Sequence, residues 1–331
     1  MTLQLHGFGH FNPENQITNA FLESLDIGTS EEWILERVGI RSRRTVLPLD
    51  YIRETRNRDP RGALEASLCT NADLGRRAAE LAIARAGIDR RDIGMLLAGT
   101  SVPDTTCPAE ACNIARALGL EVPAFDVNSA CTSFFALLYT VAIAQPEKLP
   151  PYVLLVAAEG FTRIVDYTDR ASAVLWGDGA AAAVVSARHP GRAEILGNTI
   201  ESSPAGCDKV VIPRGGHFRQ DGRAVQMFAI RRTTQMLERL RATYAEAGRP
   251  FHFIGHQANL RMLESVCRQC EIPPERHHTN VEWFGNTGAA SGPTVVSMEW
   301  DRWKANDDVA VFGVGSGLTW ASFLLRFGAT A

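Results

Sequence analysis

The chain has 331 residues, 45% of them hydrophobic, and a formal net charge of −3. This length can bury one large core or two moderate ones, and the near-neutral charge gives no reason to expect binding to nucleic acid or to an anionic membrane. Because the sequence has no run of about 18 apolar residues, we expect no membrane-spanning helix.

The expected compartment follows from the first residues and the cysteines. Residues 1–16 lack a basic region followed by an apolar run, so we expect no signal peptide. The 7 cysteines are an odd number scattered along a long chain, which fits reduced thiols better than a disulfide framework. We therefore expect a cytoplasmic protein.

The first predicted elements are capped helices and short strands. Thr29 and Glu32 form a capping-box pattern, which predicts a helix with Thr29 as its N-cap, and Gly39 suits the left-handed end of that helix. Gly87 is expected to end the next helix in the same way. The elements that follow are predicted as a helix over 71–88, a buried strand over 93–101 and a helix over 107–120.

After these elements, two series of segments resemble each other, and in each the second member is expected to turn from a strand into a helix through small residues. Their first three members are spaced by about 30 residues, the size of a strand–helix–strand unit. We interpret them as two similar α/β halves, 1–187 and 188–331. An amphipathic helix over 226–249 precedes the second series. The first series comprises 95–101, 124–133, 152–160 and 180–186, and the second comprises 251–259, 279–291, 309–317 and 320–327.

Cys131 lies where an apolar run turns into a predicted helix, in the sequence "FDVNSACTSFFALLYTVA". A helix N-terminus offers unpaired N–H groups and a partial positive charge, and both favour a thiolate. We therefore expect Cys131 to be an acidic thiol and a nucleophile. A small buried hydrophobe is the alternative for an arbitrary cysteine.

Two polar residues of the second half are further candidates for the site of Cys131. His256 directly follows an apolar strand, where an α/β fold opens its ligand-binding crevice. Asn286 holds the position equivalent to Cys131, so a pseudo-twofold axis between the halves would bring Asn286 and Cys131 face to face. Taken singly, His256 could be a structural histidine and Asn286 a turn residue; the three positions together indicate one catalytic site.

The sequence resembles the β-ketoacyl-ACP synthase III family of thiolase-like condensing enzymes over nearly its whole length. Three segments of this sequence resemble the active-site signatures of the family and follow the same order: "ACTSF" around Cys131, "GHQANLRM" around His256 and "GNTGAAS" around Asn286. Three further segments are similar to the family: "SEEWILERVGIRSR", "DRASAVLWGDGAAAAV" and "GVGSGLTWASFLLRF". The resemblance implies a five-layer α/β/α/β/α fold of two duplicated halves and a homodimer.

The resemblance also implies a chemistry for these residues. Cys131 would take the acyl group of an acyl-CoA, with an oxyanion hole made by the backbone N–H groups of Cys131 and Ser316. His256 and Asn286 would then hydrogen-bond a malonyl thioester, whose decarboxylation leaves an enolate that condenses with the acyl group. The substrates are thioesters, and we expect no separate cofactor.

Basic and aromatic residues are the candidates for binding the carriers of these acyl groups. By resemblance, Trp33, Arg37 and Arg170 would hold the adenine and phosphates of CoA, through stacking and ion pairing. Arg261 would meet an acidic acyl carrier protein, and Arg231 and Arg232 are weaker candidates for that role. Surface arginines and an aromatic side chain on a helix face are the alternatives.

Two residues depart from the family pattern, and one cysteine pair does not support a metal site. Val314 and Cys107 stand where the family usually has Phe, which indicates a divergent member with an acyl pocket of different shape. The CxxC pair Cys267 and Cys270 has no second pair, so we expect no metal site there. Two other functions stay open: a same-fold acyltransferase or specialised-metabolite enzyme that uses a non-malonyl acceptor, and a non-catalytic partner subunit.

Overall fold

The computed structural model describes residues 2–328, and its main strands form one mixed sheet in two arms. One arm has the order β1–β7–β6–β4–β5 and the other β8–β13–β12–β11. The arms join where β1 pairs with β8 at Gln4 with Glu194 and at Leu5 with Ala193. The strands are β1 (Gln4–Phe11), β4 (Ile93–Gly99), β5 (Ala124–Asp126), β6 (Tyr152–Glu159), β7 (Gly179–Ser186), β8 (Ala193–Ser202), β11 (Phe251–Ile254), β12 (Asp308–Gly315) and β13 (Thr319–Phe327).

The two arms repeat one strand pattern, which confirms the predicted duplication. In the first arm β7 runs antiparallel to both β1 and β6, and β4 runs parallel to β6. In the second, β13 runs antiparallel to both β8 and β12, and β11 runs parallel to β12. The chain passes between the arms after β7 ends at Ser186 and before β8 begins at Ala193. The exact domain boundary after residue 187 stays a prediction.

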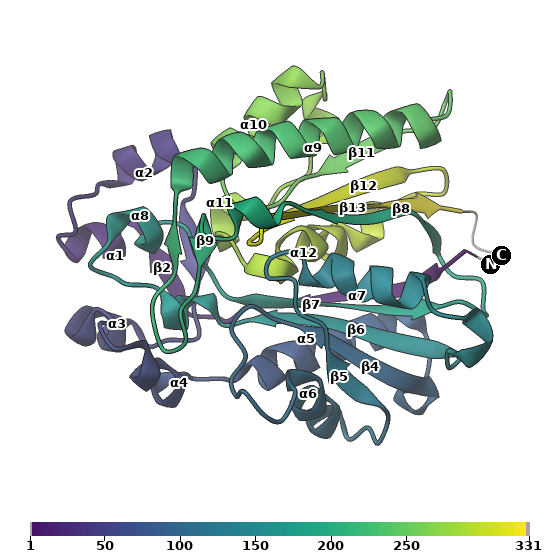
Figure 1. Cartoon of the computed structure of the whole chain (residues 1–331), viewed down its shortest axis with the longest axis horizontal. Coiled ribbons are helices and arrows are strands. Elements are labelled where there is room, and N and C mark those ends of the chain that lie inside the picture. Colours follow the sequence, from purple (N-terminus) through teal and green to yellow (C-terminus); the bar gives the residue numbers. More distant parts are fainter. Residues whose placement is uncertain (1, 329–331) are drawn as a thin grey trace.

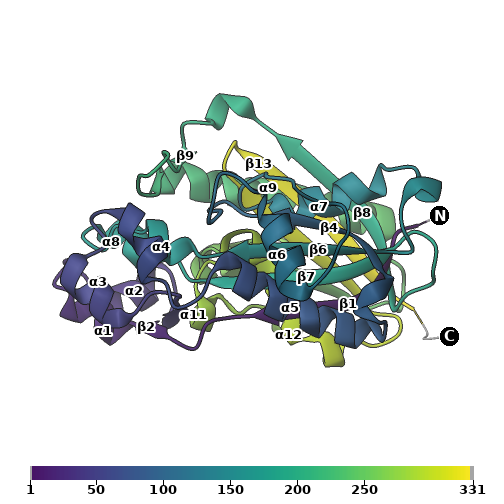
Figure 2. The ribbon, with the colours of Figure 1, turned by 90° about the horizontal axis from the view of Figure 1, so that it is seen from below.

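The helices complete five layers, which Figure 1 shows edge-on; Figure 2 views the same layers from below, where they overlap. The helices α5 and α6 cover the outer face of the first arm, α9 and α10 cover the outer face of the second, and α7 and α12 are buried between the arms. This arrangement confirms the expected thiolase-like fold. The layer helices are α5 (Asn71–Ala86), α6 (Glu110–Leu118), α7 (Ser133–Ala142), α9 (Gly222–Tyr244), α10 (Leu260–Gln269) and α12 (Ser291–Met298).

Shorter elements gather beside these layers and carry parts of the site. The helices are α1 (Asn19–Ser24), α2 (Glu31–Arg37), α3 (Leu49–Thr55), α4 (Ala63–Ala66), α8 (Arg170–Ala173) and α11 (Val281–Phe284), with a 3-10 turn η7 at Gly288–Ala290. The short strands are β2 (Gln16–Thr18), β3 (Ser42–Arg44), β9 (Val210–Val211) and β10 (Arg219–Gln220). The long amphipathic helix predicted over 226–249 is α9, which begins and ends earlier than expected.

Local capping chemistry explains the helix ends. Thr70 caps α5 through a complete capping box with Asp73, and Gly87 ends it at φ +67°, as predicted. Gly39 likewise follows α2 at φ +73°. The N-cap of α2 is Ser30, whose hydroxyl accepts the Trp33 N–H, so the prediction of Thr29 was wrong by one residue.

The predicted strand at the start of 279–291 was also wrong. Those residues contain α11 and η7, and this segment of the second arm has no counterpart of β5 among the described residues. The cause is a contact from the loop after β11: Gln257 Oε1 accepts hydrogen bonds from the hydroxyl of Thr279 and from the backbone N–H groups of Asn280 and Val281. These bonds occupy the donors that a strand would use in a sheet.

Within residues 2–328, the helices are too short or too polar to cross a bilayer.

Candidate active site

A tight turn places Cys131 just ahead of α7. Cys131 precedes the N-cap Thr132, and the residue before it, Ala130, has φ +47°. Hydrogen bonds hold this unusual backbone: the Ser133 hydroxyl donates to the Ala130 carbonyl and accepts the Ser129 N–H. Only 8% of Cys131 is exposed, so the turn presents the thiol to a confined space at the end of a buried helix.

His256 enters the same space from the second arm. It follows β11 by two residues, and its Nδ1 lies 2.9 Å from the hydroxyl of Ser291, the first residue of α12. This contact occupies Nδ1 and leaves Nε2 for a substrate. If the hydroxyl donates to Nδ1, then Nε2 carries the proton and is a hydrogen-bond donor.

Asn286 is held through both its backbone and its side chain. Its N–H donates to the Leu175 carbonyl, and its own carbonyl accepts the Gly177 N–H. Its Oδ1 accepts the N–H of Gly288 at 3.0 Å. Because the oxygen is committed to this bond, the NH₂ group is the part of the amide that is left to donate to a ligand.

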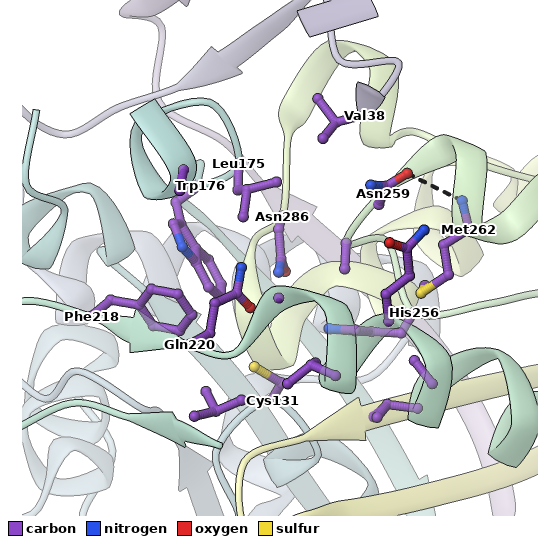
Figure 3. A pocket seen from close by; sticks show the side chains of 18 of the residues that line it. Val38, Cys131, Leu175, Trp176, Phe218, Gln220, His256, Asn259, Met262 and Asn286 are labelled. Atoms are coloured by element: carbon purple, nitrogen blue, oxygen red, sulfur yellow. Dashed lines mark hydrogen bonds between the residues drawn. The ribbon is translucent and has the colours of Figure 1, made fainter. Parts of the chain in front are cut away.

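Figure 3 shows Cys131, His256 and Asn286 with their polar ends directed toward one another. All three line one cavity of about 350 Å³, within the size range of ligand pockets. The sequence placed these residues on separate segments, and the fold brings them together across the two arms. The sequence alone could predict this convergence because each residue follows a strand or precedes a helix at matching places.

The charges in the resting site differ from our expectation for Cys131. Burial and the nearby Glu159 carboxylate raise the pKa of the Cys131 thiol well above its usual value, and its own backbone N–H opposes this only in part. Burial lowers the pKa of His256 to about 4. The site therefore holds a neutral thiol and a neutral imidazole near pH 7, and the prediction of an acidic Cys131 was wrong because desolvation outweighs the helix N-terminus.

The turn after β12 forms the wall beside the nucleophile. Ser316 lines the cavity, and its hydroxyl donates to the Val210 carbonyl. A Cβ at neighbouring Gly315 would lie 3.2 Å from the backbone nitrogens of Cys131 and Thr132, which shows how closely the two turns approach. Val314 also lines the cavity and is buried, whereas Cys107 is exposed on the loop before α6. The smaller Val314 therefore shapes the wall near Cys131.

The candidate CoA residues lie together around the Trp33 ring, and two of them line the same cavity. Trp33 and Arg37 of α2 line it, as do Ala171 and Val174 next to Arg170. The guanidinium carbon of Arg170 is 4.9 Å from the centre of the Trp33 ring, and that of Arg37 is 5.9 Å from it. This cluster joins an aromatic face to two cations. Its role in CoA binding stays a prediction.

The candidate carrier-protein residues have partners within the chain. Arg261 donates to the Leu35 carbonyl from two of its nitrogens and pairs with Glu264 at 3.0 Å, so it ties α10 to α2. Arg232 stacks on Trp320, with its guanidinium carbon 4.2 Å from the ring centre. Arg231 is exposed on α9. A carrier contact at these arginines therefore stays a prediction, and Arg261 also has a structural role.

Sequence reasoning missed several residues that organise the site. Arg43 is fully buried and donates from Nε and Nη2 to the Val174 carbonyl, next to the backbone that bonds Asn286. Gln257 ties the His256 loop to the start of α11. Glu159 is buried and accepts the N–H of Ala289, three residues after Asn286. Their partners lie more than 20 residues away, so no local spacing pattern could have identified them.

The fold and the convergent residues define a thiolase-like condensing enzyme, an acyltransferase. Comparison with known proteins agrees with this class. The family models "3-Oxoacyl-[acyl-carrier-protein (ACP)] synthase III" and its C-terminal part match residues 125–204 and 250–327. The β-ketoacyl-[acyl-carrier-protein] synthase III of Sinorhizobium medicae is 36% identical, and the alignment covers 98% of each chain. The chain therefore belongs to the β-ketoacyl-ACP synthase III family.

Solved structures give the same answer for the fold. The synthase III of Aquifex aeolicus is similar with a TM-score of 0.86 and 28% identity, over 98% of this chain and 100% of that one. The priming β-ketosynthase of the R1128 polyketide pathway has a TM-score of 0.82 and 26% identity, over 99% of this chain and 97% of that one. The relatives thus include both fatty-acid-type and polyketide-type enzymes.

Proposed function

We propose that this enzyme acylates Cys131 from an acyl-CoA and then condenses the acyl group with a malonyl thioester. The observation that carries the proposal is the convergence of a buried thiol, a neutral imidazole and an oriented amide in one cavity. Trp33 and Arg37 on the same cavity, with Arg170 against the Trp33 ring, support CoA as the acyl donor. The names of the relatives support an acyl carrier protein as the malonyl carrier.

In the first half-reaction the sulfur of Cys131 bonds to the acyl carbon while the bond from that carbon to CoA sulfur breaks. The thiol proton of Cys131 ends on the departing CoA. Backbone N–H groups of Cys131 and Ser316 stabilise the oxyanion. A neutral resting thiol means that proton removal accompanies attack, rather than preceding it.

In the second half-reaction the malonyl carboxylate leaves as CO₂, and its electron pair forms an enolate. His256 Nε2–H and the Asn286 NH₂ donate hydrogen bonds to the enolate oxygen. The carbanion attacks the acyl carbon, the bond to Cys131 breaks, and one proton from solvent restores the thiol. Two neutral donors suit this step because neither holds the enolate with a fixed charge.

The substitution His256→Ala tests the proposal. The variant is expected to take up an acyl group on Cys131, seen as a mass increase of the intact protein, because acylation depends on Cys131 and the backbone donors. Its release of labelled CO₂ from malonyl thioesters should fall by about a hundredfold or more, the usual cost of losing an oxyanion donor. Asn286→Ala should behave alike.

Wild-type protein provides the decisive control. If it becomes acylated yet releases no CO₂ from malonyl-CoA or a malonyl carrier protein, the condensing mechanism is wrong and a same-fold acyltransferase is the better assignment. His256 would then act as a base toward the acceptor. A protein that takes no acyl group from a panel of acyl-CoAs would instead be a non-catalytic partner subunit.

We further infer a homodimer in which the first arm of the sheet continues into a second copy. The strand β5 is at the end of the sheet, and Phe125 at its centre is 43% exposed. An exposed apolar residue on an unpaired strand edge favours pairing with another chain. The resemblance to the family supports the same arrangement.

A further inference from the structure

Glu159 is an ionisable group at the centre of the molecule that the proposed mechanism does not use. It is the last residue of β6 and has no exposed surface. A carboxylate in such a place is costly unless hydrogen bonds replace its water. The protein supplies those bonds from two segments far apart in the sequence, so the position of Glu159 is closely defined.

The partners of Glu159 come from both halves of the chain. In the first half, Oε2 accepts the Thr100 hydroxyl at 3.0 Å and the Ser101 N–H at 3.0 Å, and Oε1 accepts the Ser101 hydroxyl at 3.0 Å. From the second half, the Ala289 N–H donates to Oε1 at 3.1 Å. Glu159 therefore fastens the loop after β4 to the turn η7, across the boundary between the halves.

The turn η7 is also the turn that orients Asn286. Gly288 donates its N–H to Asn286 Oδ1, and the next residue, Ala289, donates to Glu159. Gly288 has φ +56°, and a Cβ added there would lie 2.8 Å from Glu159 Oε1. The turn at residue 288 therefore requires glycine for two reasons: its φ is positive, and a side chain there would collide with the Glu159 carboxylate.

We propose that Glu159 is a positioning residue for both half-reactions: it fixes the turn that carries the Asn286 amide, and it places a buried negative charge beside Cys131. This inference deepens the proposed function and rests on it for the condensation step. The effect of the Glu159 charge on Cys131 does not depend on which substrate binds.

The groups around Glu159 make its charge effective. The segments 133–142 and 287–298, which contain α7, η7 and α12, have no charged residues. On the loop after β4, Asp104 is paired with Arg163 at 2.5 Å. The ionisable residues that line the cavity are Cys131, His256 and Arg37. The pKa of Glu159 itself is raised to about 7 by burial, and its hydrogen bonds oppose this. The carboxylate thus becomes fully charged only above neutral pH, where it opposes ionisation of the thiol.

The test compares Glu159→Gln with Glu159→Asp. We measure alkylation of Cys131 by iodoacetamide, using peptide mass spectrometry between about pH 6 and pH 9, and CO₂ release from a malonyl thioester by protein that is already acylated. Glu159→Gln removes the charge, so alkylation above pH 7 should become faster by about threefold to tenfold. Glu159→Asp keeps the charge but shortens the reach to Ala289, so it should alkylate as slowly as wild type. Both variants should release CO₂ at least about tenfold more slowly.

Two controls separate positioning from general damage. Asp178→Asn removes another fully buried carboxylate, whose hydrogen bonds come from Thr162 and Val46; it should lower stability without accelerating Cys131 alkylation. Ser101→Ala removes one donor and keeps the charge, and it serves if Glu159→Gln does not fold; its CO₂ release should fall while alkylation stays slow.

Equal alkylation rates in folded Glu159→Gln and wild type would overturn the role of the charge. For Ser101→Ala, alkylation that becomes faster, or CO₂ release that stays at the wild-type rate, would overturn the proposal in the same way. Equal losses of acylation and CO₂ release in the Glu159 variants would overturn the positioning role, because a structural defect affects both steps alike. Wild-type protein that never releases CO₂ would refute the proposed function, yet the alkylation comparison would still decide whether Glu159 acts on Cys131.

Discussion

At the nucleophile, two effects act on the thiol in opposite directions. A helix N-terminus stabilises a nearby anion by about 0.3–1 kcal/mol, less than one pKa unit, whereas full burial can shift a pKa by about 3–5 units. Cys131 lies one residue before the N-cap of α7 and is almost fully buried, with Glu159 nearby. The larger effect decides, and the free enzyme holds Cys131 as a thiol.

This difference changes the expected order of chemical modification. Iodoacetamide at neutral pH should label the exposed cysteines Cys107, Cys112 and Cys207 before Cys131, because Cys131 is buried and its pKa is raised. Peptide mapping of a time course measures the order. Labelling of Cys131 ahead of these three would mean that the helix N-terminus prevails over burial after all.

The residues with proposed catalytic roles could be picked out from the sequence, and those that support them could not. Cys131, His256 and Asn286 each stand in a short motif at the end of a strand or the start of a helix. Glu159 and Arg43 act through contacts with residues more than 100 positions away, such as Ala289 and Val174. Such a contact exists only in the folded chain, so no local spacing reveals it.

Among the elements, the packing of α5 on β1 depends on two glycines. A Cβ at Gly9 would lie 2.0 Å from the carbonyl oxygen of Ala78, and one at Gly7 would lie 2.1 Å from that of Ala82. Both contacts are with helix backbone, which cannot turn aside as a side chain can. The helix therefore lies directly against the strand at the centre of the sheet.

We predict that Gly9→Ala lowers the free energy of unfolding by about 1–3 kcal/mol or more, because α5 must move away from β1. Urea denaturation measures the change through its midpoint. Gly328→Ala is the matched control, since a Cβ there meets nothing within 4 Å, and it should leave the midpoint unchanged. An unaltered midpoint for Gly9→Ala would show that the two elements can separate without cost.

An element could be predicted from the sequence when the residues that hydrogen-bond its ends are close to it in the chain. The ends of α5 rest on Thr70, Asp73 and Gly87, all next to the helix in sequence, and the prediction was confirmed. The segment that begins at Thr279 is shaped by Gln257, more than 20 residues earlier. The repeat pattern suggested a strand there, and a side chain from elsewhere in the chain prevented it.

For the whole molecule, the proposed homodimer gives a direct measurement. Sedimentation at micromolar concentration should give twice the 36.1 kDa mass of the chain. Phe125→Asp should shift the protein toward monomer, because it places a charge on the exposed edge strand β5. Met227→Lys is the control: Met227 is 65% exposed on α9, on the other arm, and should not matter. A stable wild-type monomer would contradict the dimer.

The order of the strands also bears on how the protein is made. The strand β13 is close to the end of the chain, yet it lies inside the sheet between β12 and β8. While the ribosome synthesises the protein, the edges of β8 and β12 that pair with β13 therefore stay unpaired until residues 319–327 have emerged. During that interval the second arm is incomplete and its edges can pair with other nascent chains. A chaperone that covers these edges at this stage would reduce such pairing.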